Sequence, residues 1–165
     1  MPTMVSVHHS LEEWLHTSHS VRNQIEPVVI GDEVKTTDRI LENIQLTSTE
    51  LLDVLTEIFG APVFSSGYRC TALNQIVGGA TSSAHLYGCA ADLQWREWQL
   101  SEVVQVAVDS GLPFDKLILE VRGPTHWLHV QGAEADGIPR RELIYSPEAA
   151  TYLPQSLDQM LALGF

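Results

Sequence analysis

Two potential metal ligands, His85 and Asp92, lie seven positions apart in the segment SSAHLYGCAAD, residues 82–92. If the residues around Asp92 form a β-strand, Ala90 and Asp92 point to one face, and rigid backbone carries the carboxylate. His85 lies upstream on a loop that Gly88 allows to fold back toward the strand. Imidazole and carboxylate are both zinc ligands, but a catalytic zinc site takes three protein ligands. A third ligand must therefore come from elsewhere in the chain.

The segment HWLHV, residues 126–130, offers that ligand. We expect it to be the second strand of a hairpin. Strand alternation then places His126 on one face and Trp127 and His129 on the other. Histidines on opposite faces cannot reach the same ion, so only one of them can complete the site. His129 is the candidate for the third ligand.

Glu120 is the candidate general base. A loop of residues 122–125 would set Glu120 opposite Trp127 and Ile118 opposite His129, and cross-strand partners share a sheet face. Glu120 is then a diagonal neighbour of His129, about 7–8 Å away between backbones. At that distance a carboxylate can reach a water molecule bound to the metal. Zinc lowers the pKa of such a water to about 7. The geometry needs an even loop length, because a one-residue slip would move Glu120 to the other face.

The elements that must hold these residues follow from hydrophobic periodicity and capping signals. Ser10 with Glu13, and Thr47 with Glu50, have the spacing of capping boxes at the start of helices. We expect helices at residues 51–60, 71–79, 100–111 and 155–163, and strands at residues 62–69, 89–95, 115–121 and 126–130, with 142–146 as a further edge strand. The sum predicts an α+β fold, a small and mainly antiparallel sheet with helices packed on one side.

Composition narrows the class of protein. The chain has 165 residues, a length typical of a single domain, and 44% of them are apolar. The net charge of −12 and the scattered Lys and Arg residues argue against nucleic-acid binding and against adhesion to an anionic membrane, and no membrane-spanning run occurs. Two cysteines, Cys70 and Cys89, favour free buried thiols over a disulfide, although the sequence leaves that bond open. The first residues lack the basic and apolar regions of a signal peptide, so we expect none.

The segment SAHLYGCAAD resembles the Ser-x-His-x-x-Gly-x-Ala-x-Asp signature of the M15 zinc D,D-peptidases, and WLHV resembles their closing Trp-x-His segment. The resemblance implies one Zn²⁺ per chain, bound by His85, Asp92 and His129. SSGYR, residues 65–69, is similar to the block in which the family's Arg binds substrate, which implies that role for Arg69. The implied fold is that of the Hedgehog and D,D-peptidase domains.

The resemblance is strongest over residues 10–145 and is closest to the compact phage and prophage branch, through segments such as LPFDKLILE. We therefore expect residues 1–165 to form a single zinc peptidase domain with a C-terminal extension at 146–165. In one respect the chain departs from the family. Many relatives have a catalytic carboxylate three residues before the last histidine, where this chain has His126. Glu120 is the preferred substitute, and His126 is a rival that could shuttle a proton.

Each remaining candidate site residue has a possible structural role as well as a functional one. Arg69 could pair with a surface acid. Ser83 could cap a turn or contact substrate. Tyr87 and Trp127 could wall the cleft and brace the ligands, or bind substrate. Four histidines in the polar N-terminal stretch are expected to be solvated: His8, His9, His16 and His19.

The expected function is zinc-dependent hydrolysis of peptide bonds in peptidoglycan stem peptides, as a D,D-carboxypeptidase or as an endopeptidase of the endolysin type. The alternative is a noncatalytic zinc-containing binding module or phage structural module of the same fold. No feature of the sequence demands more than a monomer. Without an export signal, we expect synthesis in the cytoplasm of a bacterium, phage-infected or lysogenic, and action at the cell wall after release.

Overall fold

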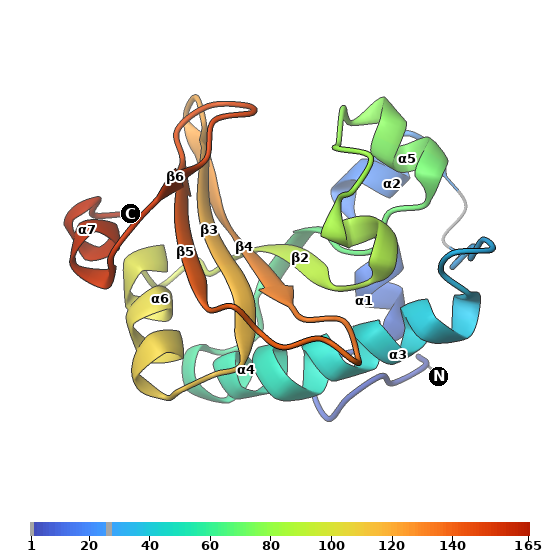
Figure 1. The fold of residues 1–165 in the computed structure, drawn as a ribbon, viewed down its shortest axis with the longest axis horizontal. Coiled ribbons are helices and arrows are strands. Elements are labelled where there is room, and N and C mark those ends of the chain that lie inside the picture. Colours follow the sequence, from blue (N-terminus) through green and yellow to red (C-terminus); the bar gives the residue numbers. More distant parts are fainter. Residues whose placement is uncertain (1, 26–27) are drawn as a thin grey trace.

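The computed structural model describes residues 2–25 and 28–165. In this part of the chain a six-stranded sheet has the order β1-β2-β4-β3-β5-β6. The strands are Val63–Ser66 (β1), Ala90–Gln94 (β2), Phe114–Arg122 (β3), Thr125–Gly132 (β4), Glu142–Ser146 (β5) and Leu153–Pro154 (β6). The α-helices are Leu11–Leu15 (α1), Ser18–Arg22 (α2), Thr37–Thr47 (α3), Asp53–Phe59 (α4), Thr71–Ile76 (α5), Leu100–Asp109 (α6) and Leu157–Ala162 (α7). A π-helical turn, Ser48–Leu52 (η1), and a 3₁₀ turn, Ala84–Tyr87 (η2), complete the elements (Figure 1).

The strand pairings confirm the predicted α+β class with a mainly antiparallel sheet. Neighbouring strands are antiparallel except β3 and β5, which are parallel and pair Leu117 with Leu143. The prediction that residues 142–146 lie at an edge is wrong, because β6 pairs with the outer side of β5. The edges are β1 and β6.

The β3–β4 hairpin has the predicted register. Glu120 pairs with Trp127 and Ile118 pairs with His129. The connection is shorter than predicted, because Arg122 pairs with Thr125 and only two residues remain in the turn. Both lengths are even, so the assignment of faces is unchanged.

One face of the sheet is the apolar core. Leu93, Leu128 and Leu119 project from β2, β4 and β3 into a single cluster that includes Leu55 of α4 and Val104 of α6. Helices α3, α4, α6 and α7 cover this face, whereas the short α2 and α5 lie beside the β1 and β2 end of the sheet (Figure 1). Helix packing is therefore concentrated on one side, as the sequence predicts.

The helix under the sheet begins earlier than predicted. Residues 37–59 are helical without a break, through α3, η1 and α4, and the side chain of Thr36 caps the start by accepting a hydrogen bond from Arg39 N. The predicted capping box of Thr47 and Glu50 is wrong, because Thr47 has helical backbone angles and its side chain caps no amide. The other predicted capping box, Ser10 with Glu13, is present at α1.

The N-terminal segment packs on this helix. His9 is buried, with Nε2 2.9 Å from Thr56 Oγ1, so the prediction that it is solvated is wrong. Asp53 accepts hydrogen bonds from Ser6 Oγ and from the backbone amides of Val7 and His8. These contacts join residues 6–9 to α4.

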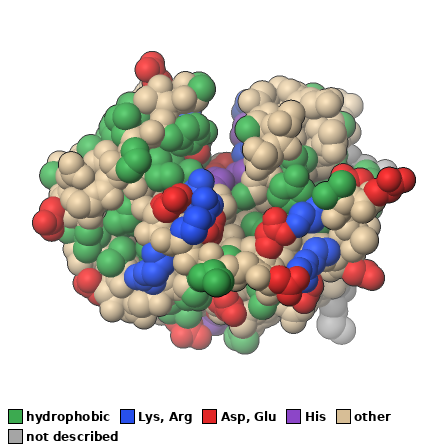
Figure 2. All heavy atoms as spheres, in the orientation of Figure 1, with side chains coloured by type: hydrophobic (Ala, Val, Ile, Leu, Met, Phe, Trp, Pro, Cys, Tyr) green, Lys and Arg blue, Asp and Glu red, His purple; other side chains and the backbone are tan. Residues whose placement is uncertain are grey.

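The opposite face of the sheet is hollowed. Figure 2 shows a notch between two raised parts of the molecule, with histidine and acidic side chains at its floor. In the same orientation, the β3–β4 hairpin and the β5–β6 connection rise on one side and α5 rises on the other, with β2 between them (Figure 1). Neither residues 2–25 nor residues 28–165 contain a helix long and apolar enough to span a membrane.

Candidate metal centre

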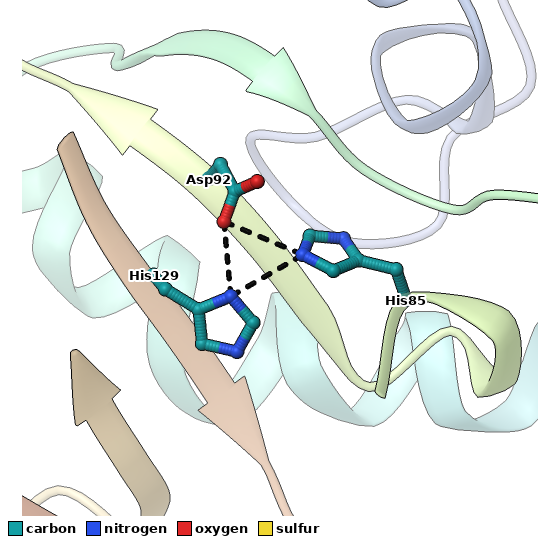
Figure 3. Close-up of side chains that lie close together, drawn as sticks. All are labelled: His85, Asp92 and His129. Carbon is teal, nitrogen blue, oxygen red and sulfur yellow. Dashed lines mark hydrogen bonds and ion pairs between the residues drawn. The ribbon is translucent and has the colours of Figure 1, made fainter. Parts of the chain in front are cut away.

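Three elements bring His85, Asp92 and His129 together. Asp92 on β2 pairs directly with His129 on β4, so both side chains share the open face of the sheet. His85 comes from η2, which ends at Gly88 in the left-handed conformation, with φ of 71° and ψ of 16°. This reversal carries the chain into β2 and leaves the His85 ring facing Asp92 (Figure 3).

The donor atoms of these residues form a small triangle. The distances are 2.9 Å between His129 Nδ1 and Asp92 Oδ1, 3.2 Å between His85 Nε2 and His129 Nδ1, and 3.3 Å between His85 Nε2 and Asp92 Oδ1. A tetrahedral zinc site with bonds of about 2.1 Å has donor–donor edges of about 3.4 Å. The triangle is thus close to one face of such a tetrahedron. All three residues are buried, with exposures of 2%, 5% and 7% for His85, Asp92 and His129.

The tautomer of His85 suits metal binding. Its Nδ1 lies 2.7 Å from the carbonyl oxygen of Gly67, which can only accept, so Nδ1 carries the proton. Nε2 then presents its lone pair to the centre of the triangle. A ligating histidine is commonly oriented in this way by a carbonyl bound to its other nitrogen.

The protein shifts the pKa of each of the three groups in the cluster in a different way. Burial lowers the pKa of His85, although the nearby charge of Asp92 opposes this shift. The lowered pKa favours a neutral ring. Burial alone would raise the pKa of Asp92, but His85 and His129 hold it well below its usual range. Burial opposes the charged form of His129 too, yet the hydrogen bond and charge of Asp92 raise its pKa. Asp92 therefore remains a carboxylate, the form that binds a cation.

Arg69 stands behind Asp92. Its Nη2 donates to Asp92 Oδ2 at 2.9 Å and its Nε donates to Ser66 Oγ at 2.7 Å. These bonds fix the second oxygen of Asp92 and leave Oδ1 facing the histidines. The acid that Arg69 pairs with is thus a member of the cluster and not a surface acid.

Glu120 lies on the same face, one diagonal step from His129. Its Oε2 accepts a hydrogen bond of 3.0 Å from Nη2 of Arg122, which also donates to Ser146 Oγ. Burial raises the pKa of Glu120, the charge of Asp92 raises it further, and His129 and Arg122 partly offset both. Within the described residues, the donor atoms that approach within 4.8 Å of one another are those of His85, Asp92 and His129, so Glu120 stands outside that set.

Comparison with known protein families matches residues 21–131 to the family described as Peptidase M15. The match covers more than half of the chain and contains all three members of the cluster. The chain belongs to the M15 peptidase family. A search among curated proteins found no match.

Trp127 and His126, which precede His129 on β4 of this M15 peptidase, point to opposite faces of the sheet. Trp127 shares the face of His129, and its Nε1 is buried without a hydrogen-bond partner among the described residues. His126 pairs with Val121 on the other face, with its ring 5.2 Å from that of Phe165. The structure therefore does not bring His126 to the cluster, because strand alternation directs it toward the helices.

Ser83 and Tyr87 flank η2. Ser83 precedes the turn, is half-buried, and its side chain makes no capping hydrogen bond. The Tyr87 ring lies under Nζ of Lys35, 5.1 Å from the ring centroid. Tyr87 also lines a groove of about 610 Å³, which Gln131 and Asp115 line as well but none of the three cluster residues does. The ring thus helps to wall that groove.

The sequence analysis missed two polar residues that contact candidate site residues of this M15 peptidase, Arg122 and Gln131. Arg122 is two residues after Glu120 and Gln131 is two residues after His129, so each shares a sheet face with the residue it contacts. The same alternation that placed Glu120 would have identified both.

The two cysteines are free thiols as predicted, with Cys89 buried and Cys70 half-buried.

Proposed function

We propose that this M15 peptidase is a zinc-dependent hydrolase of peptide bonds in peptidoglycan stem peptides. The observation that supports this most is the buried triangle of His85 Nε2, Asp92 Oδ1 and His129 Nδ1 in a chain of this family. Its edges suit tetrahedral zinc, and two imidazoles with one carboxylate are typical ligands of catalytic zinc. A closed structural site would use four protein ligands, mainly Cys and His, whereas residues 2–25 and 28–165 supply three here.

In the proposed mechanism His85, Asp92 and His129 hold the ion. When bound there, zinc would lower the pKa of a water molecule and polarise the scissile carbonyl. Arg69 keeps Oδ1 of Asp92 directed at the ion through its bond to Oδ2. The carbonyl oxygen of Gly67 orients the His85 ring by accepting a hydrogen bond from Nδ1.

Glu120 is the proposed general base. Its raised pKa suits a group that takes a proton from water and then delivers it to the leaving amine, because a base works best when its pKa approaches the working pH. Arg122 holds its Oε2, so the carboxylate is oriented before substrate arrives. We assign no role in the reaction to His126, which faces the helices.

Substrate would lie in the notch above the sheet. Arg69 uses Nε and Nη2 within the protein, and its Nη1 makes no hydrogen bond with the described residues. We assign Nη1 to the substrate carbonyl or carboxylate. Trp127 is proposed to form part of the cleft floor, and Ser83, whose side chain caps nothing, to contact the peptide backbone. We further propose that residues 1–165 act as one peptidase domain and work as a monomer.

The test is digestion of purified peptidoglycan by the zinc-loaded protein, with soluble fragments identified by mass spectrometry. We expect new stem-peptide fragments from the wild type. Glu120→Gln should retain zinc and lose about 10²–10⁴-fold in turnover, the usual contribution of a general base. Glu142→Gln, which changes an exposed carboxylate on β5, is the matched control and should remain active.

Three outcomes would be informative. Zinc bound without fragments from any variant would favour a noncatalytic binding module. Near-normal turnover of Glu120→Gln with zinc bound would overturn the assignment of the base. Fragments from the wild type and the control alone would support the peptidase and identify the bond that is cut.

A further inference from the structure

A chain of hydrogen bonds leads away from the metal centre on the side of His129. His129 Nε2 lies 3.4 Å from Gln131 Oε1, and Gln131 Nε2 donates to Asp115 Oδ2 at 2.7 Å. Arg140 closes the chain, with Nη2 donating to Asp115 Oδ2 at 2.6 Å and Nε donating to Oδ1 at 2.8 Å. Gln131 and Arg140 lie outside the motif segments that resemble the M15 family, and Asp115 lies in LPFDKLILE but has no assigned role.

We propose that Gln131, oriented by Asp115 and Arg140, is a positioning residue that keeps the proton of His129 on Nε2 and presents Nδ1 to the metal. The inference rests on the proposed function, because it assumes that His129 binds zinc. It adds a dependence of metal affinity on residues that do not touch the ion.

The direction of the hydrogen bonds along this chain follows from Asp115 and Arg140 at its far end. Arg140 donates to both oxygens of Asp115, and its backbone amide donates to Oδ1 as well. Asp115 is thus an ionised carboxylate, which can only accept hydrogen bonds. The Gln131 group 2.7 Å from it must therefore be the NH₂, because an amide oxygen at that distance would be repelled.

The orientation of Gln131 then determines the tautomer of His129. With NH₂ directed at Asp115, the amide oxygen faces His129 Nε2, and an oxygen acceptor favours a proton on that nitrogen. When zinc is bound the imidazole would be neutral with its one proton on Nε2, so Nδ1 would present a lone pair to the ion. Nδ1 is the atom that faces Asp92 Oδ1 and His85 Nε2. Reversal of the amide would favour the wrong tautomer for metal binding.

A local irregularity of β3 makes this chain possible. The β3–β4 register pairs Phe114 with Gly132 and Lys116 with Gln131, which leaves Asp115 as an extra residue in a bulge. In a regular strand the neighbours Asp115 and Lys116 would point to opposite faces. The bulge turns Asp115 toward Gln131, an effect for which bulges near functional sites are known.

Burial supports a positioning role. Asp115 is 6% exposed, and burial would raise its pKa, but the hydrogen bonds and charge of Arg140 lower it. Removing a partner that orients a metal-binding histidine typically costs 10–100-fold in metal affinity.

The experiment measures zinc affinity by competition with a chromophoric chelator. Asp115→Asn should weaken zinc binding about 10–100-fold, because the new amide no longer dictates which way Gln131 points. Gln131→Met should do the same while leaving the pair of Asp115 and Arg140 intact, so it remains informative if the first variant folds poorly. The control Lys116→Gln, on the strand position opposite Gln131, should change affinity by about twofold at most.

A double variant distinguishes positioning from a structural role. Asp115→Asn combined with Gln131→Glu exchanges amide and carboxylate, so the introduced carboxylate again accepts a hydrogen bond from Nε2 of His129 and the introduced amide donates one to that carboxylate. Zinc affinity should return to within a few-fold of wild type. The Nε2–H resonance of the His129 ring in the zinc-loaded protein should have the same hydrogen-bonded chemical shift in the wild type and the double variant, and a different shift in Asp115→Asn.

Equal zinc affinity in wild type, Asp115→Asn and Gln131→Met would overturn this inference and leave the proposed function standing. Weak affinity in both single variants without rescue, and with the Nε2–H resonance of His129 unchanged, would assign the chain a purely structural role and also overturn it. Failure of the wild type itself to bind zinc would remove both proposals together.

Discussion

Gly88 joins the turn that carries His85 to the strand that carries Asp92, and its substitution by alanine tests how that junction is built. Gly88 has φ of +71°, and a Cβ there would lie 2.7 Å from the carbonyl oxygen of Ile40 and 2.8 Å from Cγ1 of Ile44. The left-handed conformation costs a residue with a Cβ about 1–2 kcal/mol. Overpacking against α3 costs about 1–3 kcal/mol more. Gly88→Ala should therefore lower the free energy of unfolding by about 2–5 kcal/mol.

Gly111→Ala is the matched control. Gly111 has nearly the same φ, +69°, but nothing lies within 4 Å of a Cβ built there. Only the conformational cost of about 1–2 kcal/mol should remain. Urea unfolding in the presence of chelator measures both variants without a contribution from metal binding. If Gly88→Ala were no more destabilising than Gly111→Ala, steric contact with α3 would not be the reason for glycine at this position.

Three further predictions concern acid–base behaviour, thiol reactivity and metal removal. The carboxylate form of Glu120 is the active one, so turnover should rise as the pH rises through the raised pKa of Glu120. The charge of Arg122 lowers this pKa, so Arg122→Gln should move the acid limb of the pH profile to higher pH. Burial raises the pKa of Cys89 to about 12, so iodoacetamide should label Cys70 in the native protein and Cys89 only on unfolding, whereas equal labelling rates would contradict the packing around Cys89. Chelation of a metal present at about 100 times its Kd should remove about 2.7 kcal/mol of stability. In calorimetry this is a fall in Tm of about 5–11 °C, and an unchanged Tm would argue against binding to the folded state.

The part of the site that could be predicted from sequence is the part set by strand alternation. Period-two geometry placed His129 and Glu120 on one face of the hairpin and His126 on the other, and an even turn preserved that result although the turn is shorter than expected. Each of these inferences needs only local backbone geometry. The pairing of Asp92 with His129 depends on strand order, which the sequence did not predict.

The errors come from contacts that no local pattern encodes. Thr47 and Glu50 have capping-box spacing, but they lie inside a helix already capped at Thr36, and their pattern alone does not distinguish the two settings. His9 is buried by Thr56, nearly fifty residues away. The bulge that turns Asp115 toward Gln131 is likewise invisible in a regular alternation.

The zinc content of the purified wild-type protein, measured by elemental analysis beside Asp92→Asn and Asp53→Asn, tests the central claim most directly. Asp92 and Asp53 are both buried and hydrogen-bonded, but only Asp92 belongs to the cluster. We expect one zinc per chain in the wild type and in Asp53→Asn, and its loss from Asp92→Asn. Absence of zinc from all three, or equal zinc in all three, would contradict a metal centre formed by His85, Asp92 and His129.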